Sequence, residues 1–161
     1  MIRSSDEGHV IASFNPIAIV CFTRNPKDKE LELLTNLSND AVDAGVRGGL
    51  LYVVARDDLA AGVDPRVRAT FEQMTKRNAG RTGSSAVVVL SGGFVSAMVR
   101  SALAGLVLLG ASRKRVQVFS SVSDACAWLA PEHGVAPRDL VGAWERATAH
   151  IARVRPGAAT G

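Results

Sequence analysis

Ser91, Gly92, Gly93 and Arg100 form the first group of residues whose types could do chemistry. A glycine turn that opens a helix presents backbone N–H groups to an anion, and an arginine two helical turns further on could add positive charge. A tight turn with closely packed glycines and an arginine on the helix surface explains the same residues more simply. We therefore keep a ligand- or anion-binding site as a candidate here and prefer the packing interpretation.

Ser91 also stands at a predicted strand-to-helix turn, which is where one large class of hydrolases carries its nucleophile. That nucleophile turn requires a glycine two residues before the serine, and Val89 stands there instead. His9, His133 and His150 fall in predicted terminal or linker segments, and no third group marks any of them as a general base. We therefore expect no catalytic residue and a non-enzymatic protein.

Arg56, Asp57 and Asp58 directly follow a predicted buried strand. Paired carboxylates at the carboxyl end of a parallel strand can bind Mg²⁺, because ligands often dock at that edge of a sheet. No phosphate-binding loop accompanies the pair, so solvated loop acids are the simpler interpretation. We expect neither a metal site nor any other cofactor in this chain.

The charge and aromatic content argue against a nucleic-acid-binding protein. The 161 residues carry a formal net charge of +4, but scattered arginines supply the excess, and only 5% of the residues are aromatic. That content is too low for base-stacking platforms. Cys21 and Cys126 lie far apart in apolar surroundings, and we expect them to be small core residues rather than a disulfide or a metal site.

The apolar stretch 94–109 is the only candidate for a membrane span or a lipid site. It is short for a bilayer and carries Arg100 near its middle, so we reject a membrane span. The first ten residues hold charged side chains and no apolar run, which excludes an ordinary secretory signal and favours a cytoplasmic protein. The stretch could line a pocket for an acyl chain, but burial in the core explains it more simply.

Hydrophobic periodicity predicts a chain in which strands and helices alternate. The expected strands are 9–14, 17–22, 50–55, 86–90 and 116–119, and the first two form an antiparallel hairpin around Asn15-Pro16. Helices are expected at 27–44 and 94–109 and after Asp64, Ser121 and Pro137, with Asn25 as the cap of the first helix and a linker at 131–134.

The predicted fold is an α/β domain with a mixed, mostly parallel five-stranded sheet (ββαβαβαβα) and an extra C-terminal helix. Three inner strands are apolar without polar alternation, so both faces of the sheet must be covered. If the intervening helices pack mostly on one face, the last helix or a second subunit covers the other. Leu140, Trp144 and Ile151 on the last helix are therefore candidate interface residues.

Three segments carry a resemblance to a known family: 86–90, 93–101, and 116–119 followed by the Ala-x-x-Trp-Leu motif at 125–129. They resemble the STAS domain, and more closely the SpoIIAA-like group of small bacterial proteins, which is similar in turn to the CRAL-TRIO lipid-transfer fold. The resemblance covers about residues 9–129. It implies a STAS-like domain over 1–130. Beyond that domain, the residue pattern predicts a C-terminal segment over 131–155, whose helix packs on the domain or on a dimer partner, and a disordered tail over 156–161.

The resemblance also implies regulation through protein contact, with one departure. Antagonist-type STAS domains carry a phosphorylatable serine after the third strand, whereas the segment 56–62 of this chain holds no serine or threonine. Arg56, Asp57 and Asp58 occupy the equivalent of that switch loop. We therefore expect a non-enzymatic regulatory or scaffolding module that forms a homodimer or binds another protein. The alternative, from the lipid-transfer side of the resemblance, is a small protein that binds lipid or another apolar ligand.

Overall fold

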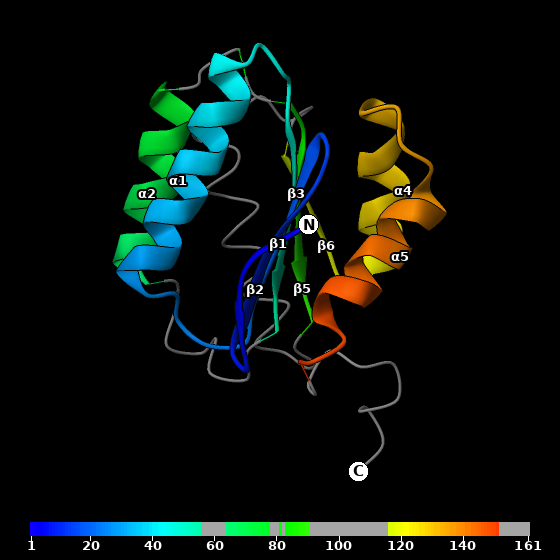
Figure 1. Ribbon diagram of the computed structural model, residues 1–161, viewed down its shortest axis with the longest axis horizontal. Helices are drawn as coiled ribbons and strands as arrows, with labels where there is room; N and C mark the ends of the chain where they lie inside the picture. The colour runs from blue at the N-terminus through cyan, green and yellow to red at the C-terminus, as the bar shows by residue number, and fades with distance from the viewer. Residues whose placement is uncertain (56–63, 78–80, 82, 91–115, 152–161) are drawn as a thin grey trace.

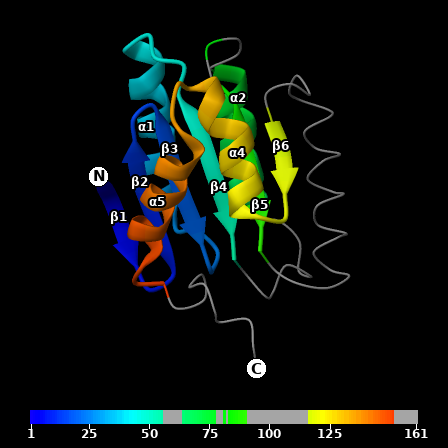
Figure 2. The ribbon, with the colours of Figure 1, turned by 90° about the vertical axis from the view of Figure 1, so that its right-hand side faces the viewer.

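A mixed six-stranded sheet forms the middle of the molecule, and its strands lie side by side in the order in which they occur in the chain. The computed structural model describes residues 1–55, 64–77, 81, 83–90 and 116–151. The second strand is antiparallel to the first and to the third, whereas the third to the sixth run parallel to one another (Figure 2). The strands are β1 (Ile2–Asp6), β2 (His9–Phe14), β3 (Ile17–Phe22), β4 (Gly49–Val54), β5 (Ser85–Val89) and β6 (Val116–Phe119).

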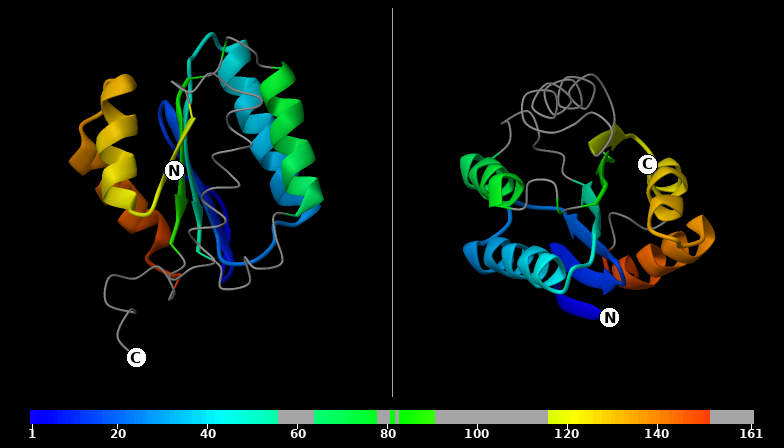
Figure 3. Two further views of the ribbon diagram at one scale, coloured as in Figure 1. Left: turned by 180° about the vertical axis from the view of Figure 1, so that it is seen from behind. Right: turned by 90° about the horizontal axis from the view of Figure 1, so that it is seen from above.

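Helices cover both faces of this sheet. On one face lie α1 (Asp28–Asp43) and α2 (Pro65–Arg77), and on the other lie α4 (Val122–Glu132) and α5 (Pro137–Thr148), as Figures 1 and 3 show. The prediction of an α/β fold with a mixed sheet is thereby confirmed, as is the expectation that both faces are covered. Within the described residues, no helix combines the length and the apolar character needed to cross a membrane.

The inner strands are apolar on both sides because each side meets a different helical layer. In β3, Ile17, Ile19 and Cys21 join the larger hydrophobic cluster, which includes residues of α4 and α5. Val20 and Phe22 join the smaller cluster, which includes Leu34 of α1. Successive strand side chains point to opposite faces, so a strand covered on both faces loses the polar alternation of a half-exposed one.

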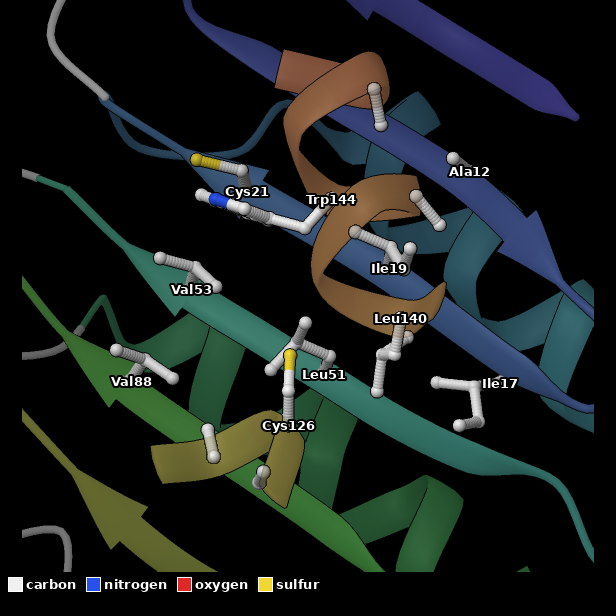
Figure 4. Close-up of a cluster of buried hydrophobic side chains, with 14 of the residues drawn as sticks. Ala12, Ile17, Ile19, Cys21, Leu51, Val53, Val88, Cys126, Leu140 and Trp144 are labelled. Atoms are coloured by element: carbon white, nitrogen blue, oxygen red, sulfur yellow. The ribbon is translucent and has the colours of Figure 1, made fainter. Parts of the chain in front are cut away.

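The larger cluster is formed where α4 and α5 pack on the sheet. Figure 4 shows Leu140 and Trp144 directed from α5 toward β3 and β4. Leu140 is 0% exposed, Trp144 6% and Ile151 1%. The candidate interface residues therefore lie in the core of their own chain, because the last helix folds back over its own sheet. These three side chains therefore have almost no exposed surface that a dimer partner could bury.

Strand β1 is missing from the predicted elements, so the sheet has six strands where the sequence predicts five. The prediction failed because Arg3, Ser4, Ser5 and Asp6 show no apolar run. Such a composition suits an edge strand that faces solvent, and every residue of β1 except the half-buried Ser4 is exposed.

Three helix boundaries also differ from the prediction. The last helix, α5, ends at Thr148, whereas the sequence predicts a helix that reaches residue 155. Helix α4 continues to Glu132 and contains Pro131, where the sequence predicts a linker. A proline so close to the helix end removes only one late hydrogen bond, so the helix continues past it. At α1 the cap is Lys27 rather than Asn25, with Glu30 closing a capping box. The helices expected after Asp64 and Ser121 are present, and each of these two residues accepts a hydrogen bond from a backbone N–H of the helix that it precedes.

Candidate functional site

The tight turn between β1 and β2 brings an acid and an imidazole together at one edge of the sheet. Asp6 and His9 are cross-strand partners that flank Glu7 and Gly8. The carboxylate oxygen Oδ1 of Asp6 accepts a hydrogen bond of 2.7 Å from the Gly8 backbone N–H. His9 is also the strand neighbour of Phe22, the last residue of β3. The pair therefore lies at the carboxyl edge of the parallel strands, where α/β proteins often bind ligands.

Arg24 reaches the same place from the connection between β3 and α1, and Glu30 reaches it from the first turn of α1. Arg24 donates to both carboxylate oxygens of Glu30, with Nη2–Oε1 at 2.7 Å and Nη1–Oε2 at 3.0 Å. This is the two-pronged geometry that makes arginine–carboxylate pairs strong. The Lys27 backbone N–H also donates to Oε2, at 2.8 Å, so the helix start holds the Glu30 side chain in position.

One nitrogen of Arg24 lies at the centre of the group. Its Nη2 atom is 2.7 Å from Glu30 Oε1, 2.8 Å from Asp6 Oδ2 and 3.1 Å from His9 Nδ1. We call Asp6, His9, Arg24 and Glu30 the edge cluster. Its positive charge is surrounded by one imidazole and two carboxylates that come from three separate segments of the chain.

The edge cluster is half open to solvent. The side chains of His9 and Glu30 are 5% and 7% exposed, whereas those of Arg24 and Asp6 are 29% and 43% exposed. Burial alone would raise the pKa of Glu30, but the hydrogen bonds from Arg24 and from the Lys27 N–H hold that pKa below its ordinary value. The pKa of Asp6 is likewise lowered against its burial, by Gly8, Arg24 and His9. The two carboxylates are therefore ionised and held by hydrogen bonds.

His9 connects Asp6 to a serine in a way that resembles a nucleophile–base–acid relay. Nε2 of His9 lies 2.8 Å from Ser4 Oγ, and Nδ1 lies 2.8 Å from Asp6 Oδ1. In a working relay the carboxylate stabilises the imidazolium that forms when the serine loses its proton. Here the Arg24 guanidinium is bonded to that same carboxylate and lies beside the ring. A fixed positive charge opposes formation of a second one, so the spacing alone does not make Ser4 a nucleophile.

The donor set of the edge cluster is better suited to a cation. One ligand atom each from Asp6, His9 and Glu30 can be chosen so that all three lie within 4.8 Å of one another. Imidazole nitrogen and carboxylate oxygen are the ligands of divalent first-row metals. In the state described here the cationic group among them is the Arg24 guanidinium.

A second polar group lies at the opposite, amino edge of the parallel strands. The hydroxyl of the buried Ser84 donates to Glu132 at the end of α4. The neighbouring His133 ring packs so closely on Gly49 and Gly83 that a Cβ on either glycine would approach its ring atoms to 2.6 Å or less. His133 Nε2 is buried and has no hydrogen-bond partner within the described structure. No hydrogen bond joins Ser84 to His133 in that part of the chain, so the group forms no relay.

Of the site residues predicted from the sequence, one group lies in the described part of the chain and the others do not. Ser91, Gly92, Gly93 and Arg100 lie outside the described residues, as do Arg56, Asp57 and Asp58 and the apolar stretch 94–109. Leu140, Trp144 and Ile151 lie in the core.

The residues that form the edge cluster were not identified from the sequence. The signal for Asp6 and His9 was a two-residue Glu-Gly connection, which would have paired them across a hairpin. The signal for Glu30 was its place three residues after Lys27, where a side chain turns back to the start of its helix. No local pattern marked Arg24, because its partners lie 6 and 18 residues away in the chain.

Comparison of the chain with models of known protein families, with curated proteins and with solved structures gives no match.

Proposed function

We propose that this protein is a non-catalytic regulatory or scaffolding module of the cytoplasm that pairs with a second copy of itself through strand β1. The observation that carries the proposal is the exposure of this edge strand. In the described part of the chain the exposed large apolar side chains are Met1 at 76%, Ile2 at 50% and Val46 at 37%. Ile2 is the first residue of β1, and Met1 directly precedes it. An open strand edge next to exposed apolar side chains is a typical site for strand addition.

The register of the first hairpin supports the same surface. In a two-residue hairpin the residues that flank the turn form a hydrogen-bonded pair, and the next pair along does not. Asp6 and His9 flank the turn, so Ser5, opposite Val10, directs its backbone N–H and C=O away from β2. Because β1 is the outermost strand, these two groups of Ser5 face outward and can bond a further strand.

Because both faces of the sheet are covered, a second copy of the chain is more easily bound at the edge of the sheet than on a face. In the described structure α1 and α2 cover one face of the sheet, and α4 and α5 cover the other (Figure 3). Neither face is therefore free to bind a second copy of the chain. Two arginines near the carboxyl edge are paired with carboxylates of the described chain, Arg24 with Asp6 and Glu30, and Arg66 with Asp28 and Asp64. This pairing favours a structural or binding role over acid–base catalysis.

The test is light scattering of purified protein over a range of concentrations, with two variants at one residue. Ser5→Pro removes the outward N–H without touching the hydrogen bonds to β2, and proline is tolerated on edge strands. Ser5→Ala keeps the N–H and is the matched control. We expect a monomer–dimer equilibrium for the wild type and for Ser5→Ala, and a monomer for Ser5→Pro. A wild type that is monomeric throughout, or a dimer that Ser5→Pro leaves intact, contradicts the proposal.

We further propose that the sheet is a variant of the STAS arrangement, as in the SpoIIAA-like proteins, with β1 added at the antiparallel edge. The support is the mostly parallel sheet that follows an antiparallel hairpin, together with the Ala-x-x-Trp-Leu motif of α4, whose Ala125 and Leu129 are buried against the sheet. The alternative role in binding lipid rests on residues 94–109, and no observation on the described residues favours it.

A further inference from the structure

We propose that Asp6, His9 and Glu30 form a binding site for a divalent first-row metal ion such as Zn²⁺, and that Arg24 is a built-in competitor for it. The inference does not depend on the proposed dimer. It starts from the position of one atom: Arg24 Nη2 lies 2.7 Å, 2.8 Å and 3.1 Å from Glu30 Oε1, Asp6 Oδ2 and His9 Nδ1. A cationic nitrogen in contact with three potential metal ligands marks the point at which a metal ion would be bound.

The remaining atoms of the same side chains are held by other partners. Glu30 Oε2 accepts from the Lys27 N–H at 2.8 Å, and Asp6 Oδ1 accepts from the Gly8 N–H at 2.7 Å. Each carboxylate therefore has one oxygen fixed by the backbone and one directed at the central point. Support of this kind orients ligands before the metal binds and is typical of metal sites.

His9 has a partner that suits ligation through Nδ1. Its Nε2 lies 2.8 Å from Ser4 Oγ, and a serine hydroxyl can donate or accept. With Arg24 in place, Nδ1–H can donate to Asp6 Oδ1 at 2.8 Å while Ser4 donates to Nε2. With a metal at the centre, Nε2–H donates to Ser4 and the Nδ1 lone pair faces the metal. The proton moves from one ring nitrogen to the other, and the net charge of the ring is unchanged.

Arg24 has a route out of the centre. Its side chain is 29% exposed, while His9 and Glu30 are almost fully buried. A metal ion could therefore take the place of the guanidinium while the arginine turns toward solvent, and the two buried ligands would stay where they are. The 43% exposure of Asp6 leaves the outer side of the metal open to water, so three protein ligands and one open position would result.

The site discriminates among cations by its ligands. One imidazole with two carboxylates suits Zn²⁺, Co²⁺ or Mn²⁺, whereas Ca²⁺ and Mg²⁺ prefer sites made of oxygen alone. Because the metal ion must displace Arg24, the wild type should bind it more weakly than the same three ligands would without the arginine. Removal of the arginine should therefore strengthen metal binding, which is the opposite of what loss of a purely structural ion pair would do.

The experiment is isothermal titration calorimetry with ZnCl₂ on the full chain, repeated with CoCl₂ by visible absorption to report the coordination. We expect Arg24→Gln to bind Zn²⁺ at least about tenfold more tightly than the wild type, and Zn²⁺ to raise the Tm of this variant. Asp6→Asn should bind at least about tenfold more weakly than the wild type. Asp28→Asn, which changes an exposed carboxylate at the same edge, and His133→Gln at the opposite edge are the matched controls and should bind as the wild type does.

Three results would overturn the site. They are the absence of Zn²⁺ binding in both the wild type and Arg24→Gln, equal affinity in the wild type and Asp6→Asn, and loss of binding in either control. If Arg24→Gln does not fold without metal, recovery of its folded circular dichroism spectrum on addition of Zn²⁺ supports the site. Failure of Zn²⁺ to restore that spectrum, with equal affinities in the wild type and Asp6→Asn, counts against it.

Discussion

The two faces of the sheet hold the molecule together in different ways. Under α4 and α5 the buried side chains form one continuous apolar cluster that includes residues of β2 to β5. Under α1 and α2 the apolar cluster is smaller, and its row of rings passes from Tyr52 through Phe22 to the stacked ring of His9. The second face therefore ends in charged groups, while the first remains apolar. The difference separates a face that stabilises the fold from a face that carries the candidate site.

The largest loss of stability should come from a substitution on the side of the sheet under α4 and α5, which we call the apolar face. Leu140 is 0% exposed, and Leu140→Ala should lower the free energy of unfolding by about 3 kcal/mol, because it removes buried methyl groups and leaves a cavity. Urea unfolding followed by circular dichroism measures the change. Arg138→Ala on the outer side of the same helix, with a side chain 90% exposed, is the control and should leave the midpoint unchanged. Equal effects of the two substitutions would show that α5 is not packed on the sheet.

The next largest loss of stability should come from the side of the sheet under α1 and α2, which we call the charged face. Replacing Arg24 there should destabilise the fold more than replacing Arg66. Arg24→Gln leaves the buried Glu30 without its charge partner and should cost about 2 kcal/mol, less than the loss of a fully buried pair because Arg24 is 29% exposed. Arg66→Gln removes a more exposed arginine that is also paired with two carboxylates, and it should leave urea unfolding unchanged.

The double variant Arg24→Gln/Glu30→Gln sharpens the same comparison. It should recover part of the loss, because no buried carboxylate is then left unpaired. Urea unfolding of the two single variants and the double variant gives the interaction energy of the pair. Additive losses would show that Arg24 and Glu30 do not interact in solution.

Acid should weaken the charged face selectively. The pKa values of Asp6 and Glu30 lie below their ordinary values of 3.8 and 4.5 in the folded chain. A carboxylate whose pKa is lowered by folding stabilises the fold above its ordinary pKa, and this contribution is lost as the pH falls through the lowered value. The difference in unfolding free energy between the wild type and Arg24→Gln should therefore be full at pH 7 and should narrow below about pH 4.5. A difference that stays constant from pH 7 to pH 3 would exclude this linkage.

The smallest expected effect is at the two buried cysteines, whose thiols should not react in the native protein. Burial raises the pKa of Cys21 to about 12 and that of Cys126 to about 11, so neither thiol should react with a disulfide reagent until urea unfolds the chain. Rapid reaction of either thiol in the native protein would show that the apolar face is open to solvent.

The spacing of Ser4, His9 and Asp6 has its own test. A fluorophosphonate probe should not label the protein, because Arg24 opposes the charge that His9 would have to take. Labelling that Ser4→Ala abolishes would instead establish a hydrolytic site. An unlabelled wild type, with a known serine hydrolase as the positive control, is the expected result.

The sequence predicted the apolar part of this molecule far better than the charged part. The strands 17–22, 50–55 and 86–90 stand out as uninterrupted apolar runs, and they correspond to β3, β4 and β5 within one residue. Such runs report burial on both faces, which is a property of each segment by itself. The same reasoning required a cover for the second face and named the last helix as one of two possibilities.

The edge cluster was beyond this kind of reasoning for a physical reason. Its members are ordinary surface residue types, and only the pairing of β1 with β2 and the turn of Arg24 toward α1 bring them together. A polar edge strand has no hydrophobic period to reveal it, so β1 was missed, and Ser4 and Asp6 were missed with it. The interface role expected for Leu140, Trp144 and Ile151 failed for the converse reason, since an apolar helix face does not show which sheet it covers.

The most direct test of the proposed role is amide hydrogen exchange of Ser5 as a function of protein concentration. In a single copy the Ser5 N–H faces outward from the edge of the sheet and should exchange rapidly, whereas strand addition would protect it. We expect exchange at Ser5 to slow as the concentration rises, while amides in β4 remain equally protected throughout. Exchange at Ser5 that is equally fast at every concentration would contradict pairing through β1.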